Sequence, residues 1–180
     1  TGVPDSLLKE LISCMSENLD SSRYLIAANE GNAIAVASGY NLATGKIPAV
    51  FMQNSGLGNC INPLTSLTNK EVYSVPMILL IGWRGEPGII DEPQHLLPGK
   101  ILKNQLDLIN IPYFVINHDT NISEAIDRMV RKVNKLNSPV ALIFKKDCFK
   151  KYEQKKLKKI NQDYYRREAI ETIINNGGKK

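Results

Sequence analysis

The sequence has few of the residues that build disulfide frameworks, zinc sites or membrane spans. Its 180 residues include only two histidines and three cysteines, Cys14, Cys60 and Cys148, with no CxxC pair. Three widely spaced thiols form neither a disulfide scaffold nor a structural zinc site, and they favour a reducing, cytoplasmic compartment. The longest apolar runs, residues 75–81 and 140–144, are far shorter than the roughly 20 residues that cross a bilayer. We therefore expect no membrane association.

Common signatures of hydrolases and nucleotide-binding proteins are also missing. The chain contains no HExxH, GxSxG, GxGxxG or GxxxxGK[ST]. This removes support for metalloproteases, α/β-hydrolases, dinucleotide-binding proteins and P-loop NTPases. The chain starts with TGVP, without a Met and without a secretory signal, so we expect an excised domain of a longer protein.

The positive charge is confined to one end of the chain. The formal net charge is +5, but residues 145–180 carry +7 while residues 1–144 carry −2. A basic tail raises the hypothesis of a non-catalytic module that binds nucleic acid. Such binding weakens steeply with salt, because phosphate contacts release counterions. Apart from Tyr164 and Tyr165 the tail lacks interleaved aromatic side chains, so a solvated linker is the preferred interpretation and we expect no nucleic-acid partner.

The first 144 residues alternate between short β-rich runs and helical patterns. This predicts an α/β fold of three layers, αβα, with a mostly parallel central sheet. We expect strands at residues 24–28, 49–52, 76–81, 113–116 and 140–144, and helices at 5–15, 31–44 and 122–136. Residues 1–145 would form one domain. Residues 146–180 would form a basic linker and the start of a following domain, with a short helical pattern at 166–175.

Ligands of parallel α/β sheets bind beyond the carboxyl ends of the strands, so the loops there are the candidate sites. Glu30 stands at the end of the first predicted strand and directly before a helix rich in small residues. It is either a functional carboxylate or a solvated acid favoured by the helix dipole. The loop QNSGLGN at residues 53–59 either brings its backbone against a flat or anionic ligand or is a tight turn into a helix.

The longest irregular segment follows the third predicted strand, at residues 82–95. Arg84 could bind an anionic substrate group through two parallel hydrogen bonds, or it could pair with Glu86 or Asp91 in a structural ion pair. His95 could act as an acid, a base or a hydrogen-bond donor. His118 and Cys60 have no such context, and we interpret both as structural.

Several of these motifs together resemble one family. The runs NEGNAIAVASGY from Asn29, QNSGLGN from Gln53, GWRGEPG from Gly82 and DEPQH from Asp91, with the opening TGVPDSLL, are similar to the pyrimidine-binding domain of thiamine diphosphate-dependent decarboxylases of the phosphonopyruvate decarboxylase family. The alpha subunit of sulfopyruvate decarboxylase is a close relative and a free-standing domain of this kind. The resemblance covers roughly residues 1–145.

The resemblance implies roles for the flagged residues. Glu30 would hydrogen-bond a ring nitrogen of the cofactor's pyrimidine and share a proton with it, and burial would favour the protonated carboxyl group. The loop residues Asn54, Ser55, Gly56 and Leu57 would line the pyrimidine pocket. Asp5 would help to deliver a proton, and Arg84 and His95 would contact the carboxylate or phosphonate of the substrate.

The resemblance also implies partners. The family's Mg²⁺ is held by a Gly-Asp-Gly motif and a downstream Asn in a diphosphate-binding domain, and this chain contains neither. We therefore expect half of each active site here, with no metal ligands. The other half would come from a diphosphate-binding domain of the same or a neighbouring chain, in a dimer or higher homo-oligomer. This fragment alone should not decarboxylate a 2-keto acid.

Overall fold

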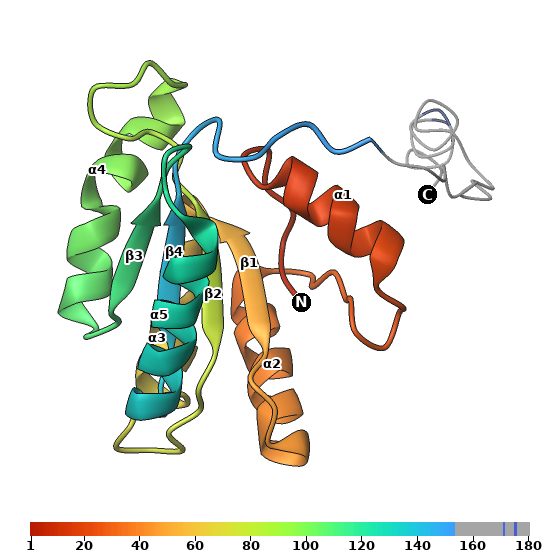
Figure 1. The fold of residues 1–180 in the computed structure, drawn as a ribbon, viewed down its shortest axis with the longest axis vertical. Coiled ribbons are helices and arrows are strands. Elements are labelled where there is room, and N and C mark those ends of the chain that lie inside the picture. The colour runs from red at the N-terminus through yellow and green to blue at the C-terminus, as the bar shows by residue number, and fades with distance from the viewer. Residues whose placement is uncertain (154–170, 172–174, 176–180) are drawn as a thin grey trace.

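The centre of the molecule is a four-stranded sheet in which every strand runs the same way. The computed structural model describes residues 1–153, 171 and 175. The strands are β1 (Ala49–Gln53), β2 (Ile78–Gly82), β3 (Tyr113–Ile116) and β4 (Val140–Phe144), in the spatial order β1-β2-β4-β3. All three pairings are parallel. The carboxyl ends of all four strands therefore meet at one edge, where the arrowheads lie in Figure 1.

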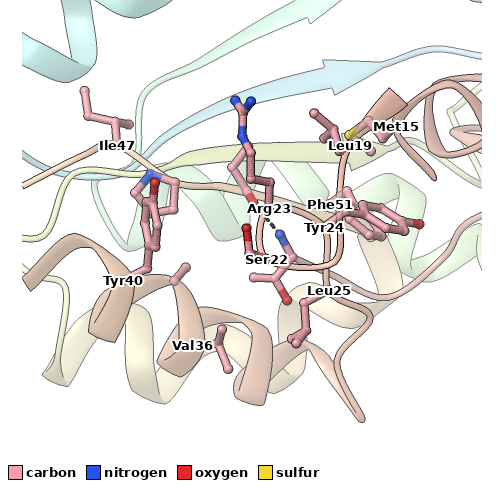
Figure 2. A pocket seen from close by; sticks show the side chains of 14 residues that line it. Met15, Leu19, Ser22, Arg23, Tyr24, Leu25, Val36, Tyr40, Ile47 and Phe51 are labelled. Carbon is pink, nitrogen blue, oxygen red and sulfur yellow. Dashed lines mark hydrogen bonds between the residues drawn. The ribbon is translucent and has the colours of Figure 1, made fainter. Parts of the chain in front are cut away.

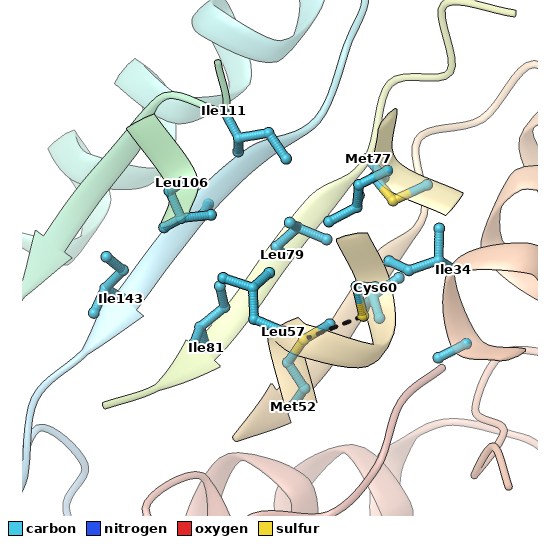
Figure 3. Packing of buried hydrophobic residues seen from close by; sticks show 14 of the residues in the cluster. Ile34, Met52, Leu57, Cys60, Met77, Leu79, Ile81, Leu106, Ile111 and Ile143 are labelled. Carbon is cyan, nitrogen blue, oxygen red and sulfur yellow. Dashed lines mark hydrogen bonds between the residues drawn. The ribbon is translucent and has the colours of Figure 1, made fainter. Parts of the chain in front are cut away.

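Helices cover both faces of this sheet. They are α1 (Lys9–Asn18), α2 (Glu30–Thr44), α3 (Leu57–Ser66), α4 (Pro93–Leu108) and α5 (Ile122–Leu136). One hydrophobic cluster joins α2, α3 and α4 to the sheet, and part of it is drawn in Figure 3. A second cluster joins α1 and α5 to the opposite face. The predicted αβα fold with a parallel sheet is confirmed.

Strand β4 shows why the core consists of two clusters. Its side chains alternate between the faces, so Ala141 and Ile143 enter the α2–α4 cluster while Val140, Leu142 and Phe144 enter the α1–α5 cluster. All five side chains are buried. A strand covered on both faces needs apolar residues at every position, which explains its uninterrupted apolar sequence.

The helix predicted at residues 122–136 is confirmed without change as α5. The Asn121 side chain accepts a hydrogen bond from the backbone N–H of Glu124 at 3.3 Å and so caps the first turn. Asn137 ends the helix in the left-handed conformation, with φ of 48°. Met129 and Val133 of the apolar stripe are buried, whereas Ile122, Ile126 and Val130 are partly exposed.

Two local predictions at the N-terminal end were wrong. Residues 24–28 do not form a strand, because only Ile26 makes a bridge, to Gly2. The first residues of the chain lie between this segment and β1, and Gly2 also bridges to Phe51. The first helix begins at Lys9, since residues 5–8 form a turn in which the Leu8 N–H donates to the Asp5 carbonyl. The helical pattern predicted at 166–175 falls almost wholly outside the described residues.

Residues 146–153 run back from β4 and contact α1. The Tyr152 N–H donates to the Glu10 carboxylate at 2.6 Å, and its hydroxyl bonds the Glu17 carboxylate at 2.9 Å. Within the described part of the chain, no helix is long and apolar enough to cross a bilayer.

Candidate active site at the carboxyl edge of the sheet

Glu30 is the first residue of α2 and lies over the turn that follows β1. That turn is a short 3₁₀ helix, Asn54–Gly56, which leads directly into α3. A Cβ atom at Gly56 would overlap the Glu30 carboxyl group, and one at Gly31 would lie 2.8 Å from the Asn59 carbonyl oxygen. Glycine at both positions therefore lets the start of α2 approach α3 closely.

The Glu30 carboxylate is held by one hydrogen bond. The Asn59 side-chain amide donates to Oε2 at 2.7 Å, and no donor to Oε1 occurs among the described residues. The side chain is half-buried, less than the sequence led us to expect. Oε1 is therefore available to a ligand, and Asn59 sets the direction in which it points.

Asn54 connects this turn to the loop after β2. Its side chain is almost fully buried, its amide nitrogen donates to the Arg84 carbonyl at 2.9 Å, and its amide oxygen accepts from the Arg84 N–H at 3.0 Å. This pair of bonds satisfies both polar ends of a buried amide. The Gly-rich turn and the Arg84 loop consequently form one rigid unit.

The Arg84 guanidinium pairs with Asp91, one of the two ion pairs that the sequence left open. Its Nε donates to Asp91 Oδ2 at 2.8 Å, its Nη2 donates to Oδ1, and its Nη1 donates to the Ser6 hydroxyl at 2.9 Å. Asp91 also accepts from the Gly85 N–H at 2.7 Å. The side-chain hydrogen bonds from Arg84 hold the pKa of Asp91 well below its usual range.

Asp5 is the most unusual carboxyl group at this edge. It is 6% exposed, its Oδ2 accepts from the Leu7 N–H at 3.1 Å, and its Oδ1 has no partner among the described residues. A Cβ atom at Gly82 would overlap Oδ2, so the carboxyl group lies against the end of β2. Burial raises the pKa of Asp5 above its usual value, although the Leu7 bond and the Arg84 charge oppose the shift.

The remaining candidates take different places. His95 lies in the first turn of α4, and its Nδ1 is 3.3 Å from the amide nitrogen of Gln53. The roles of the ring nitrogens in this contact depend on the tautomer, and a neutral ring that accepts from Gln53 at Nδ1 carries its proton on Nε2. Ser55 is exposed and accepts from Gln53 at 2.7 Å. The Leu57 side chain lies in the hydrophobic core with no exposed surface, so it supports the turn from behind and does not face the edge.

The two residues interpreted as structural are Cys60 and His118. Cys60 is fully buried, and burial raises the pKa of its thiol to about 12. Its Sγ lies 3.8 Å from Met52 Sδ in the core (Figure 3). His118 is exposed and lies 3.2 Å from the Asp119 carboxylate. No group of three metal-ligating side chains occurs within the described residues.

The structure adds residues that sequence reasoning missed. Asn59 holds Glu30, and Lys146 lines a cavity of about 230 Å³ beside Arg84. No local signal marks Asn59 as a partner of Glu30, because the two residues lie in different helices and are 29 positions apart in the sequence. Lys146 belongs to the stretch whose composition indicated a linker.

A second cavity, of about 270 Å³, lies away from these loops. Its walls come from α1, α2, the start of β1 and the segment before α2, and Figure 2 shows Val36 and Tyr40 on one side with Met15 and Leu19 on another. The rings of Tyr24 and Phe51 stack within it at 5.9 Å. None of the candidate site residues lines this cavity.

The carboxyl edge of the parallel sheet thus carries one accessible carboxylate over a glycine turn and one buried carboxyl group. The chain belongs to the family described as thiamine pyrophosphate enzyme, N-terminal TPP binding domain, which matches residues 1–108. The resemblance seen in the motifs is thereby confirmed.

The relatives include two kinds of decarboxylase. Phosphonopyruvate decarboxylase of Streptomyces viridochromogenes is 42% identical over 120 residues, which are 67% of this chain and 29% of that protein. The enzyme of the same name from Streptomyces hygroscopicus is 40% identical over 64% of this chain and 28% of its own length. Sulfopyruvate decarboxylase subunit alpha of Methanocaldococcus jannaschii is 31% identical over 79% of this chain and 81% of that subunit. The chain thus spans less than a third of the two phosphonopyruvate decarboxylases.

Proposed function

We propose that the chain is the pyrimidine-binding half of a thiamine diphosphate-dependent 2-keto acid decarboxylase. Its reaction would convert 3-phosphonopyruvate into phosphonoacetaldehyde and CO₂ in phosphonate biosynthesis. The observation that carries this proposal is the Glu30 carboxylate, held over Gly56 with Oε1 unengaged at the carboxyl edge of the sheet. The identity to two phosphonopyruvate decarboxylases supports the choice of substrate.

The residues present suit the pyrimidine end of the cofactor. A flat ring needs close approach to a backbone, and the glycine turn from Asn54 to Gly56 with Ser55 exposed allows it. Glu30 Oε1 is the group that would hold a proton at a ring nitrogen, while Asn59 orients it. When bound, thiamine diphosphate supplies a thiazolium ring that accepts the electron pair released with CO₂.

Asp5 has the properties of a proton donor for the same site. Because burial raises its pKa, Asp5 keeps its proton at a higher pH than an exposed aspartate does. Its unsatisfied Oδ1 lies at the edge where β2 ends. His95 would donate from Nε2 to the substrate, and Arg84, whose charge Asp91 compensates, would offer the substrate the N–H groups that Asp91 and Ser6 leave free.

A complete active site needs a partner. We propose that a diphosphate-binding domain, of the same or a neighbouring chain, supplies the Mg²⁺ and the diphosphate contacts within a homo-oligomer. Residues 1–145 would be the pyrimidine domain, and 146–180 would connect it to that domain. The three cysteines are unpaired, which supports a cytoplasmic location.

The test is Glu30→Gln in the complete enzyme, meaning this chain together with its diphosphate-binding domain. Glutamine keeps the shape of the side chain but cannot hold a proton on Oε1, so turnover should fall by at least about 100-fold. Glu124→Gln is the matched control, because Glu124 is also a first-turn glutamate, in α5, and is exposed. Near-normal turnover of the Glu30 variant would refute the assignment.

The second candidate is the alpha subunit of a sulfopyruvate decarboxylase. It is favoured by the Methanocaldococcus jannaschii subunit, of which this chain covers 81%. The two candidates differ only in the anionic tail of the substrate. Comparing kcat/KM for 3-phosphonopyruvate and sulfopyruvate with the same enzyme preparation separates them, since the preferred keto acid gives the larger value.

A further inference from the structure

The cavity of about 230 Å³ beside Arg84 belongs to the same edge as the candidate site. Its walls are formed by Leu7, the loop of residues 83–91 and Lys146. Leu7 belongs to the turn of residues 5–8 and its N–H donates to the Asp5 carboxyl group, and the loop continues from β2. The cavity therefore opens next to the group that would donate a proton.

One charged group of the cavity has no partner. Among the lining groups, Arg84 pairs with Asp91, and Glu86 forms an ion pair with Lys145, which comes from outside the lining. Lys146 is exposed and has no acidic partner among the described residues. An anion bound in the cavity would give Lys146 such a partner.

Backbone hydrogen bonds of the residues before Lys146 position it at the cavity. The Lys145 N–H donates to the Ile116 carbonyl at 3.0 Å, and the Trp83 N–H donates to the Phe144 carbonyl at 2.9 Å. The ammonium groups of Lys103 and Lys145 lie 4.7 and 5.9 Å from the centre of the Trp83 ring. The backbone of residues 144–145 is hydrogen-bonded on both sides, and the Lys145 side chain forms an ion pair with Glu86. These contacts fix the backbone directly before Lys146, which lines the cavity.

We propose that this cavity receives the tetrahedral anionic tail of the 2-keto acid, a phosphonate or a sulfonate, and that Lys146 recognises its charge. The proposal rests on the function proposed above. Arg84 is held in place by Asp91 and Ser6, so it shapes the site, whereas the ammonium group of the exposed Lys146 is free to contact the bound anion.

The experiment measures Lys146→Met in the complete enzyme. Methionine keeps most of the length of the lysine side chain and removes its charge. A hydrogen bond to a charged group contributes enough that kcat/KM for the preferred keto acid should fall about tenfold to 100-fold, mainly through KM. The inhibition constant of methylphosphonate or methanesulfonate, whichever matches that tail, should rise by a similar factor. Affinity for thiamine diphosphate should not change.

The controls separate the tail from the rest of the substrate. Pyruvate lacks the tail, so its kcat/KM, or its inhibition constant where turnover is too slow, should change less than about twofold. Lys146→Arg should recover most of the loss, and Lys150→Met, at an exposed lysine outside the cavity, should behave like the unmodified enzyme. Comparing the two acids with tails shows whether the tail is a phosphonate or a sulfonate.

Equal losses for pyruvate and the acids with tails, or equal effects at Lys146 and Lys150, would overturn the assignment of Lys146 while leaving the decarboxylase intact. An unmodified enzyme that binds no thiamine diphosphate and converts none of the keto acids would overturn both proposals at once.

Discussion

Gly56 is expected to set the position of Glu30, and Gly56→Ala tests this directly. A Cβ atom there would stand 2.5 Å from Cγ and Cδ of Glu30, whereas ordinary contacts lie at 3.4–4 Å. The glutamate must therefore retreat by about 1 Å, and misplacing a reacting group by that much costs on the order of 100-fold in rate. We expect kcat of the complete enzyme to fall by about that factor.

The fold should tolerate the same change. Gly56 has φ of −71° and ψ of −15°, which alanine adopts without strain. Glu30 is half-buried and can turn away, losing the bond from Asn59, worth about 1 kcal/mol. Alanine recovers roughly 0.4–1 kcal/mol by restricting the unfolded chain. The free energy of unfolding, measured in urea, should change by less than about 1 kcal/mol.

Gly58→Ala is the matched control two residues away. A Cβ atom there meets nothing within 4 Å, and the residue lies inside α3, where alanine is favoured by about 0.5–1 kcal/mol. This variant should be slightly more stable and fully active. If Gly56→Ala keeps its activity within threefold, or if Gly58→Ala loses as much, the inferred link between the glycine and the carboxylate is wrong.

Two further predictions concern the carboxyl groups of Asp5 and Asp91. Burial raises the pKa of Asp5, so the folded chain binds its proton more tightly than the unfolded chain, and stability is lost as the pH rises above about 4. Asp5→Asn should therefore gain stability relative to the parent between pH 4 and 8 in urea unfolding, and the opposite trend would contradict the burial argument. Arg84 lowers the pKa of Asp91, which contributes stability above about pH 4 that is lost as the pH falls. Asp91→Asn should cost about 2 kcal/mol at pH 7 and less at pH 3, since both side chains are partly shielded from solvent, and an equal cost at both values would rule out the ion pair as its source.

The sequence predicted the elements whose signals are local. The helix at 122–136 was placed without error, because an apolar stripe at helical spacing, an Asn cap at one end and an Asn in the left-handed conformation at the other all lie within 17 residues. All four strands of the sheet were predicted to within two residues for a similar reason, as buried strands are continuous apolar runs. The strand at 24–28 failed because pairing depends on a neighbour far away in the sequence.

The candidate site also has some features that local sequence signals predict and others that depend on tertiary contacts. The sequence by itself determined that a helix begins beside Glu30 and that the Gly56 turn leads from a strand into a helix, because residue type and periodicity mark such boundaries. Only the tertiary structure decided that Asp91 and not Glu86 holds Arg84, that Asp5 is buried against Gly82, and that Lys146 faces a cavity. These contacts depend on the register in which parallel strands align their carboxyl ends, and that register is set by packing on both faces of the sheet, which local sequence patterns do not contain.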